Sequence, residues 1–363
     1  MSVDNRTSQE IQEFIIRNVG NHPTDIGRLT AEKFGLSRVA IVNRLGALIK
    51  AGLLVAEGKT KARRYTLKVL NSHKTELQIG PGLTEDQVWL RDVKPHLLSV
   101  PSNVLDICAH GVTEMVNNVI DHSGSTTAAI SVSRDAATII ITIRDYGVGI
   151  FRKIQQALNL SDPQYAILEL AKGKLTTDQA KHTGEGIFFT SRMFDEFSIA
   201  SGTLLFIRLR RTDDWLFESD EAPKDGTEVV LKIATNAGHT AKEIFDKYRA
   251  EFDQFGFSKT NIPLALLKYE GEQLISRSQA KRLMARIDQF REVILDFKGI
   301  TSIGQAFADE VFRIYRRDHP GVNVYPVNMA PDVKGMIQRS LSGNPDDPLH
   351  EYLRSDMDKQ RVM

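Results

Sequence analysis

The sequence predicts a multidomain α+β protein. The chain has 363 residues, which is more than most single domains, so two or three separate hydrophobic cores are expected. Its first part combines three short helical patterns with two short strand patterns, and its last third alternates strand with helix. Between them lie β-branched strand patterns and one long amphipathic helix. We therefore expect three units of mixed secondary structure in series.

The composition is that of an ordinary globular protein, with 41% hydrophobic and 26% charged residues. Cys108 is the only cysteine, which excludes an intrachain disulfide. The amino end lacks an apolar signal region, and no apolar run approaches the roughly 18 residues needed to span a bilayer. The sequence therefore predicts a cytoplasmic protein that makes no membrane contact.

The net charge of +1 conceals an uneven distribution. Residues 1–75 hold 13 Lys and Arg against 6 Asp and Glu, whereas the remainder holds 34 against 40. A basic segment of this kind indicates contact with nucleic acid, although an acidic protein partner or the acidic remainder of the chain would also satisfy it.

The most informative stretch is an amphipathic helix that we expect to begin near Ser102. Its apolar residues recur at a spacing of three and four; they are Val104, Leu105, Cys108, Val112, Met115, Val116 and Val119. The opposite face carries Glu114, Asn117, Asn118, Asp121 and His122. A solvated face is the ordinary explanation of such a pattern, but a solvated face normally alternates Lys with Glu. Acidic and amide groups without Lys or Arg instead suit a metal ion and a water molecule.

Three further motifs follow this helix. A β-branched strand pattern, 138–145, ends in Asp145 and is followed by two closely spaced glycines, Gly147 and Gly149. The run 182–189, His-Thr-Gly-Glu-Gly-Ile-Phe-Phe, enters a helical pattern. The run 225–233 opens a strand with Asp-Gly-Thr.

The four motifs, in this order, resemble the GHKL or Bergerat-fold ATP-binding domain shared by gyrase, MutL, histidine kinases and anti-sigma-factor kinases. The resemblance covers roughly residues 84–234 and implies an α/β-sandwich that binds ATP with Mg²⁺. Residues 152–181 would then form a helix and a polar lid, and residues 211–224 a polar loop.

The resemblance assigns roles to individual residues. Glu114 would be the general base that orients water, and Asn118, one helical turn away, would be the protein ligand of Mg²⁺, a hard ion that prefers oxygen. Asp145 would accept a hydrogen bond from the adenine amino group. The remaining ATP-binding candidates are Asp121, His122, Gly147, Gly149, Thr183, Gly184, Gly186 and Thr227.

The small size of glycine also explains why these positions suit a nucleotide site. Gly147 and Gly149 would let the backbone pass close beneath a nucleotide, where any Cβ would collide. Gly184 and Gly186 precede a helix, whose N–H groups and dipole can hold polyphosphate.

Residues 1–72 resemble a winged helix-turn-helix domain, because three short helices precede a hairpin with a basic turn. The third helix, with Val39, Val42, Leu45, Leu48 and Ile49 on its buried side, would be the recognition helix. Its groove-facing candidates are Arg38, Asn43 and Arg44, and the candidates for phosphate contact on the wing are Lys59, Lys61, Arg63 and Arg64. A winged helix that binds protein instead of DNA stays open as the alternative.

The rest of the chain divides as follows. We expect a linker at 73–83, a connecting helix at 235–260, a small α/β unit at 261–345 and a polar tail at 346–363. Within the α/β unit, the run 295–310 resembles the STAS-like domain of unknown function and, more distantly, anti-sigma-factor antagonists. Those antagonists carry a phosphorylated serine where the helix after the central strand begins, whereas here the run is Gly-Gln-Ala-Phe, 304–307, without a hydroxyl.

Three functions are consistent with these features. In the first, binding and slow hydrolysis of Mg-ATP control the winged-helix module and a STAS-like partner domain, with pairing of two copies as one means. The second is a serine protein kinase of a partner switch. The third is an ATPase subunit of a larger defence or repair assembly that docks protein partners.

Overall fold

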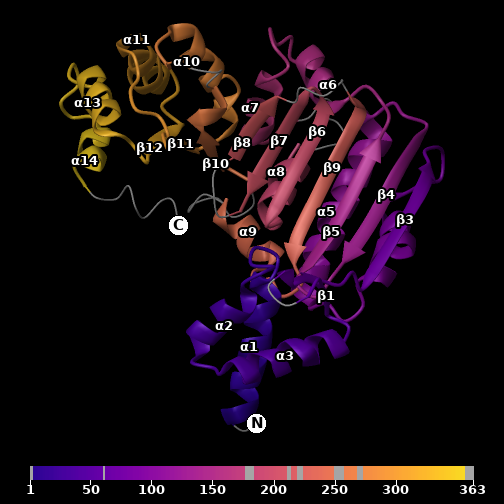
Figure 1. Ribbon diagram of the computed structural model, residues 1–363. Helices are drawn as coiled ribbons and strands as arrows, with labels where there is room; N and C mark the ends of the chain where they lie inside the picture. Colours follow the sequence, from indigo (N-terminus) through magenta and orange to yellow (C-terminus); the bar gives the residue numbers. More distant parts are fainter. Residues whose placement is uncertain are drawn as a thin grey trace.

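The computed structural model describes residues 3–59, 62–175, 184–210, 214–218, 224–248, 257–267 and 273–355. Within these residues the chain forms a mixed α/β protein of three units, each with its own sheet (Figure 1). The sheets have two, seven and three strands in chain order. The mixed, multidomain class expected from the sequence is therefore confirmed.

The N-terminal unit contains three helices and a hairpin. Its elements are α1 (Val3–Asn18), α2 (Ile26–Phe34), α3 (Arg38–Lys50), β1 (Leu54–Glu57) and β2 (Arg64–Leu67). Residues from α1, α2, α3 and β1 bury a core of their own, separate from the core of the other two units.

One prediction about α3 was wrong. Val39 and Val42 were expected on its buried side, but their side chains are 70% and 57% exposed. Ile41 is buried instead, together with Leu45 and Leu48. Positions 41, 45 and 48 share one helical face, and positions 39 and 42 point away from it. The solvent-facing side of α3 is therefore partly apolar.

The central unit is built on an antiparallel sheet in the order β3-β4-β5-β9-β6-β7-β8. The strands are β3 (Asn71–Gln78), β4 (Thr127–Arg134), β5 (Thr138–Asp145), β6 (Glu196–Gly202), β7 (Leu204–Leu209), β8 (Asp214–Glu218) and β9 (Lys224–Ala234).

Two segments expected as connections are edge strands of this sheet. β3 occupies most of the predicted linker 73–83 and pairs with β4 from Asn71 to Gln78. β8 lies inside the predicted polar loop 211–224 and pairs with β7. In β3 only Leu77 is buried, because one face of this edge strand stays in contact with solvent.

The helices of the central unit are α4 (Glu85–Val88), α5 (Ser102–His122), α6 (Ile150–Ala157), α7 (Tyr165–Lys172), α8 (Gly186–Met193) and α9 (Ala241–Lys247), with a π-turn at Trp89–Val93 and a 3₁₀ turn at Lys94–His96. α5 begins at Ser102, as the sequence predicted. It approaches α8 and the sheet so closely that a Cβ on Gly111 would lie 2.4 Å from the Phe194 ring. Cys108 is fully buried on the apolar side of α5, and burial raises the pKa of its thiol to about 12.

The expected lid and connecting helix also differ from the structure. Residues 152–181 were expected to form a helix and a polar lid, with the run from Ala171 in the lid, but residues 165–172 form the buried helix α7, and Lys172 at its end is only 1% exposed. Residues 176–181 lie outside the described residues. Between 235 and 260 the described part contains the short helix α9, and residues 259–260 already belong to the next strand.

The C-terminal unit has a three-stranded parallel sheet in the order β10-β11-β12. Its strands are β10 (Lys259–Pro263), β11 (Glu292–Asp296) and β12 (Asn323–Val327). Its helices are α10 (Arg277–Met284), α11 (Gln305–Ala308), α12 (Arg316–Asp318), α13 (Pro331–Ser340) and α14 (Pro348–Arg354), with shorter turns at Leu264–Leu267 and Ile287–Gln289 and a π-turn at Asp309–Tyr315.

The central and C-terminal units share one continuous hydrophobic core. At their boundary, Thr260 at the start of β10 donates a hydrogen bond from Oγ1 to the carbonyl of Lys172 at 2.7 Å. Phe257 and Phe290 meet with ring centroids 5.4 Å apart, and Phe257 also contacts Phe188 of α8. The two units are therefore joined through α7 and α8, which contact each other.

Candidate functional site

A cavity of about 310 Å³ lies between α5, α6, α8 and the ends of strands β5 and β9. Its lining combines apolar side chains with a small number of polar groups, as is usual for a small-molecule site. The lining residues are Glu114, Met115, Asn117, Asn118, Val119, His122, Ser123, Ile143, Asp145, Gly149, Ile150, Lys153, Ile154, Leu170, Leu175, Gly184, Gly186, Ile187, Phe188, Ile199, Thr227 and Val229. Four of the sequence motifs therefore meet at one cavity.

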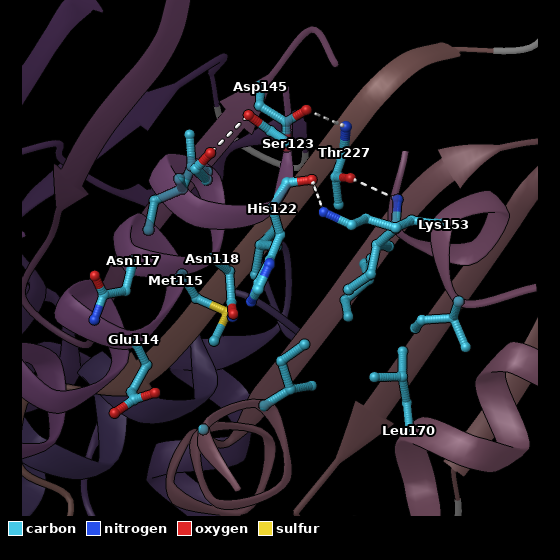
Figure 2. A pocket seen from close by; sticks show the side chains of 18 of the residues that line it. Glu114, Met115, Asn117, Asn118, His122, Ser123, Asp145, Lys153, Leu170 and Thr227 are labelled. Atoms are coloured by element: carbon cyan, nitrogen blue, oxygen red, sulfur yellow. Dashed lines mark hydrogen bonds between the residues drawn. The ribbon is translucent and has the colours of Figure 1, made fainter. Parts of the chain in front are cut away.

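One end of the cavity is formed by Asp145 and Thr227 (Figure 2). Asp145, the last residue of β5, is 4% exposed. Its Oδ1 accepts hydrogen bonds from the backbone N–H of Gly147 at 2.9 Å and of Thr227 at 3.3 Å. Burial raises the pKa of this carboxyl, and the two N–H donors counteract part of the rise. A fixed carboxylate with capacity to accept more hydrogen bonds can recognise a ligand N–H group.

Glu114 lies at the other end, with Asn118 and His122 between it and Asp145 (Figure 2). The Glu114 carboxylate lies so close to Gly186, the first residue of α8, that a Cβ on Gly186 would be 2.0 Å from Glu114 Oε2. Within the described residues, nothing hydrogen-bonds the side-chain amide of Asn118, which is half-buried. This end therefore presents a carboxylate, an amide oxygen and the N-terminus of a helix.

Lys153 is a cavity residue that the sequence motifs missed. It lies one turn into α6, and its Nζ donates a hydrogen bond to the carbonyl of His122 at 2.7 Å. A basic residue four positions after Gly149 was the available signal, since it lies on the first turn of the helix that the second glycine opens. Lys153 therefore brings a positive charge to the cavity lining, beside Thr227 (Figure 2).

The structure brings together most of the residues that the sequence selected. Glu114, Asn118, His122, Asp145, Gly149, Gly184, Gly186 and Thr227 all line the cavity. Asp121, which is exposed near the end of α5, and Gly147 do not. Thr183 lies outside the described residues.

The expected reason for the two glycines after Asp145 needs correction. A Cβ on Gly147 would lie 1.9 Å from the carbonyl oxygen of Ser123, at the end of α5. A Cβ on Gly149, at φ +87, would lie 2.6 Å from Ser201 Oγ. Both glycines therefore allow close packing of protein against protein, and only Gly149 also borders the cavity.

The DNA-binding candidates of the N-terminal unit are placed differently from one another. Arg38, Asn43, Lys59, Arg63 and Arg64 are exposed. Arg44 is half-buried, and its Nη1 donates a hydrogen bond to Ser8 Oγ of α1 at 2.9 Å. The Arg44 side chain therefore points towards α1 of its own unit. Lys61 lies outside the described residues.

Two further findings limit the kinds of site present. Among the described residues, no three His, Cys, Asp or Glu side chains are grouped so as to hold a metal ion. A hard cation in the cavity would therefore find fewer than three such ligands among the described residues, and Asn118, a bound ligand and water would supply much of its shell. In the same part of the chain, no helix is long and apolar enough to cross a membrane.

Part of the C-terminal unit matches a family model. Residues 279–334, from α10 into α13, match the model of the STAS-like domain of unknown function (DUF4325). This segment is a STAS-like domain. No curated protein matches the chain.

The STAS-like domain lacks a hydroxyl where its α11 begins. The helix starts at Gln305, with Gly304 as its N-cap residue. The match therefore identifies the domain, while the helix start offers no phosphoacceptor side chain.

Proposed function

We propose that the cavity binds Mg-ATP and that slow hydrolysis there regulates the flanking units. The observation that carries the proposal is the arrangement of the cavity. At one end, two N–H donors hold the buried carboxylate of Asp145. At the other end lie Glu114, beside the N-terminus of α8, and Asn118. This is the arrangement that the resemblance to GHKL ATP-binding domains implies.

Each end of the cavity has a separate task in this proposal. Asp145 accepts a hydrogen bond from the adenine amino group, and the guanine of GTP has no amino group at that position. Asn118 supplies an amide oxygen to Mg²⁺, whose other ligands are phosphate oxygens and water. The N-terminal N–H groups of α8 hold the polyphosphate, and Glu114 orients the attacking water.

Calorimetry with nucleotides tests the proposal directly. We expect the wild-type protein to bind Mg-ATP more tightly than Mg-GTP, and Asp145→Asn to weaken ATP binding by about tenfold or more, because an amide gives up the charged acceptor. Asn118→Ala is expected to remove the dependence on Mg²⁺. Asp121→Asn is the matched control on the same helix, since its side chain lies outside the cavity and should leave the affinity unchanged.

Turnover is separated from binding by Glu114→Gln. This variant should retain Mg-ATP and lose about 10²-fold or more of the release of inorganic phosphate. Failure of the wild-type protein to bind ATP at millimolar concentration, or equal affinity for ATP and GTP, would refute the proposed nucleotide site. Labelled phosphate on a protein in place of free phosphate would identify a kinase, although the STAS-like domain has no hydroxyl at the start of α11.

The N-terminal unit is proposed to be the output module, as a winged helix that binds DNA. Its exposed residues on α3 and the hairpin, Arg38, Asn43, Lys59, Arg63 and Arg64, are the groove and phosphate contacts in this proposal. The apolar side chains of Val39 and Val42 on the same surface can contact thymine methyl groups. An acidic protein partner would be recognised by the same charges.

Fluorescence anisotropy with duplex DNA, with and without Mg-ATP, tests this output. We expect the double variant Lys59→Ala/Arg63→Ala to weaken DNA binding. The slope of log affinity against log salt concentration should fall by about two, because about two phosphate contacts are lost. Arg28→Ala is the control, because Asp25 and Glu32 already neutralise Arg28 at 2.8 and 3.0 Å. Equal loss in both variants would argue against a hairpin contact with phosphate.

A further inference from the structure

The short segment after α7 forms part of the cavity wall. Gly173 and Lys174 both have positive φ, +86 and +51, and turn the chain towards Leu175. The N–H of Leu175 donates a hydrogen bond to the carbonyl of Gly184 at 3.0 Å, and both residues line the cavity. Residues 173–175, called the wall segment below, therefore set the position of one side of the cavity.

The STAS-like domain holds this wall segment through Arg286. The guanidinium donates from Nη2 to the carbonyl of Lys174 and from Nη1 to Oε2 of Glu169 in α7, each at 2.6 Å. In return, Lys174 donates from Nζ to the carbonyl of Gln289 at 2.9 Å. One side chain of the STAS-like domain therefore ties α7 and the wall segment together.

The geometry requires the forked donor of arginine. Glu169 Oε2 and the Lys174 carbonyl are bound by different nitrogens of the same planar group, and a lysine ammonium could satisfy one acceptor while releasing the other. Arg286 itself has φ +61, a conformation that is uncommon for a residue with a side chain. Such a backbone persists where the surrounding contacts hold it in place.

We infer that Arg286 of the STAS-like domain is a positioning residue for the central cavity: it fixes the wall segment and thereby couples the STAS-like domain to nucleotide affinity. The link to nucleotide rests on the proposed function. The positioning of Leu175 by Arg286 does not rest on the proposed function, because it is a property of the ligand-free protein.

The substitutions Arg286→Lys and Arg286→Met separate positioning from simple stability. Arg286→Lys keeps a positive charge beside Glu169 and gives up the bond to the Lys174 carbonyl; Arg286→Met removes both. If Arg286 positions the wall, both variants should weaken Mg-ATP binding by about 3- to 30-fold. Only Arg286→Met should lower the melting temperature markedly, since it alone deprives Glu169 of this cation. Arg277→Lys and Arg277→Met are the controls, because Arg277 is an exposed arginine at the start of α10 in the same C-terminal unit.

Hydrogen exchange at the Leu175 amide gives a second readout that needs no nucleotide. In the wild-type chain this amide should be protected by its bond to Gly184, and Arg286→Lys should lose that protection while the Arg277 variants keep it. Unchanged protection of Leu175 in Arg286→Lys would overturn the inference, even for a protein that fails to bind ATP. Loss of protection with wild-type nucleotide affinity would confine Arg286 to a structural role and overturn the coupling.

Discussion

Gly226→Ala is expected to destabilise the protein by about 3 kcal/mol or more and to abolish nucleotide binding. Gly226 has φ +75, in the left-handed region that side chains rarely adopt. A Cβ there would also lie 2.1 Å from the carbonyl oxygen of Asp145. Relief of this clash must separate the end of β5 from the start of β9, where Asp145 and Thr227 are joined. Urea unfolding and calorimetry with Mg-ATP measure the two effects.

Gly202→Ala is the matched control for this variant. Gly202 also has positive φ, +60, but nothing lies within 4 Å of the position that its Cβ would take. The control should therefore cost only the backbone strain, about 1 kcal/mol, and leave nucleotide affinity unchanged. Similar losses in the two variants would mean that strain alone governs Gly226 and that the contact with Asp145 is not tight.

The sequence was informative wherever one element carried its own signal. The apolar spacing from Val104 to Val119 located α5, and the β-branched run before Asp145 located β5. Polar residues on α5 were then assigned to a ligand because they lacked lysine and arginine. Glu114 and Asn118 indeed line the cavity, whereas Asp121 does not, since residues on one broad polar face can still point to different surroundings.

The sequence failed where burial depends on contacts between distant segments. The polar residues on the exposed face of β3 predict a linker, because the pairing of β3 with β4 cannot be seen in a local pattern. Val39 and Val42 were placed inside because they are apolar, but the packing of α3 buries Ile41 and leaves both valines exposed. Gly147 was assigned to a nucleotide, although its close neighbour is the carbonyl of Ser123.

α7 shows the same limit most clearly. The lysines and glycine around position 172 are typical of a surface loop, yet the Lys172 side chain is 1% exposed. Its acceptors come from Glu169 on its own helix and from residues 282 and 285, more than 100 positions later in the chain. No local pattern contains that information, because the STAS-like domain must dock before the ammonium has its partners.

Lys172→Met should therefore be among the most destabilising single substitutions, at about 3–5 kcal/mol. The ammonium has three donors and three acceptors: Glu169 Oε1 at 2.6 Å and the carbonyls of Arg282 and Ala285 at 3.1 and 2.9 Å. Burial lowers the pKa of Lys172, and the Glu169 carboxylate offsets part of this effect. Methionine fills a similar volume but removes the donor that the carbonyls of Arg282 and Ala285 share, and it leaves Glu169 with Arg286 as its cation.

A double-mutant cycle with Glu169→Leu, followed by urea unfolding, tests that assignment. The double variant should cost clearly less than the sum of the two single variants, because removing both charges avoids leaving either one buried without its partner. Lys242→Met is the control: Lys242 pairs with Asp246 on the surface with 83% of its side chain exposed, so its loss should cost less than about 1 kcal/mol. Additive losses at 169 and 172 would show that the buried ammonium owes its stability to the carbonyls of the STAS-like domain and not to the carboxylate.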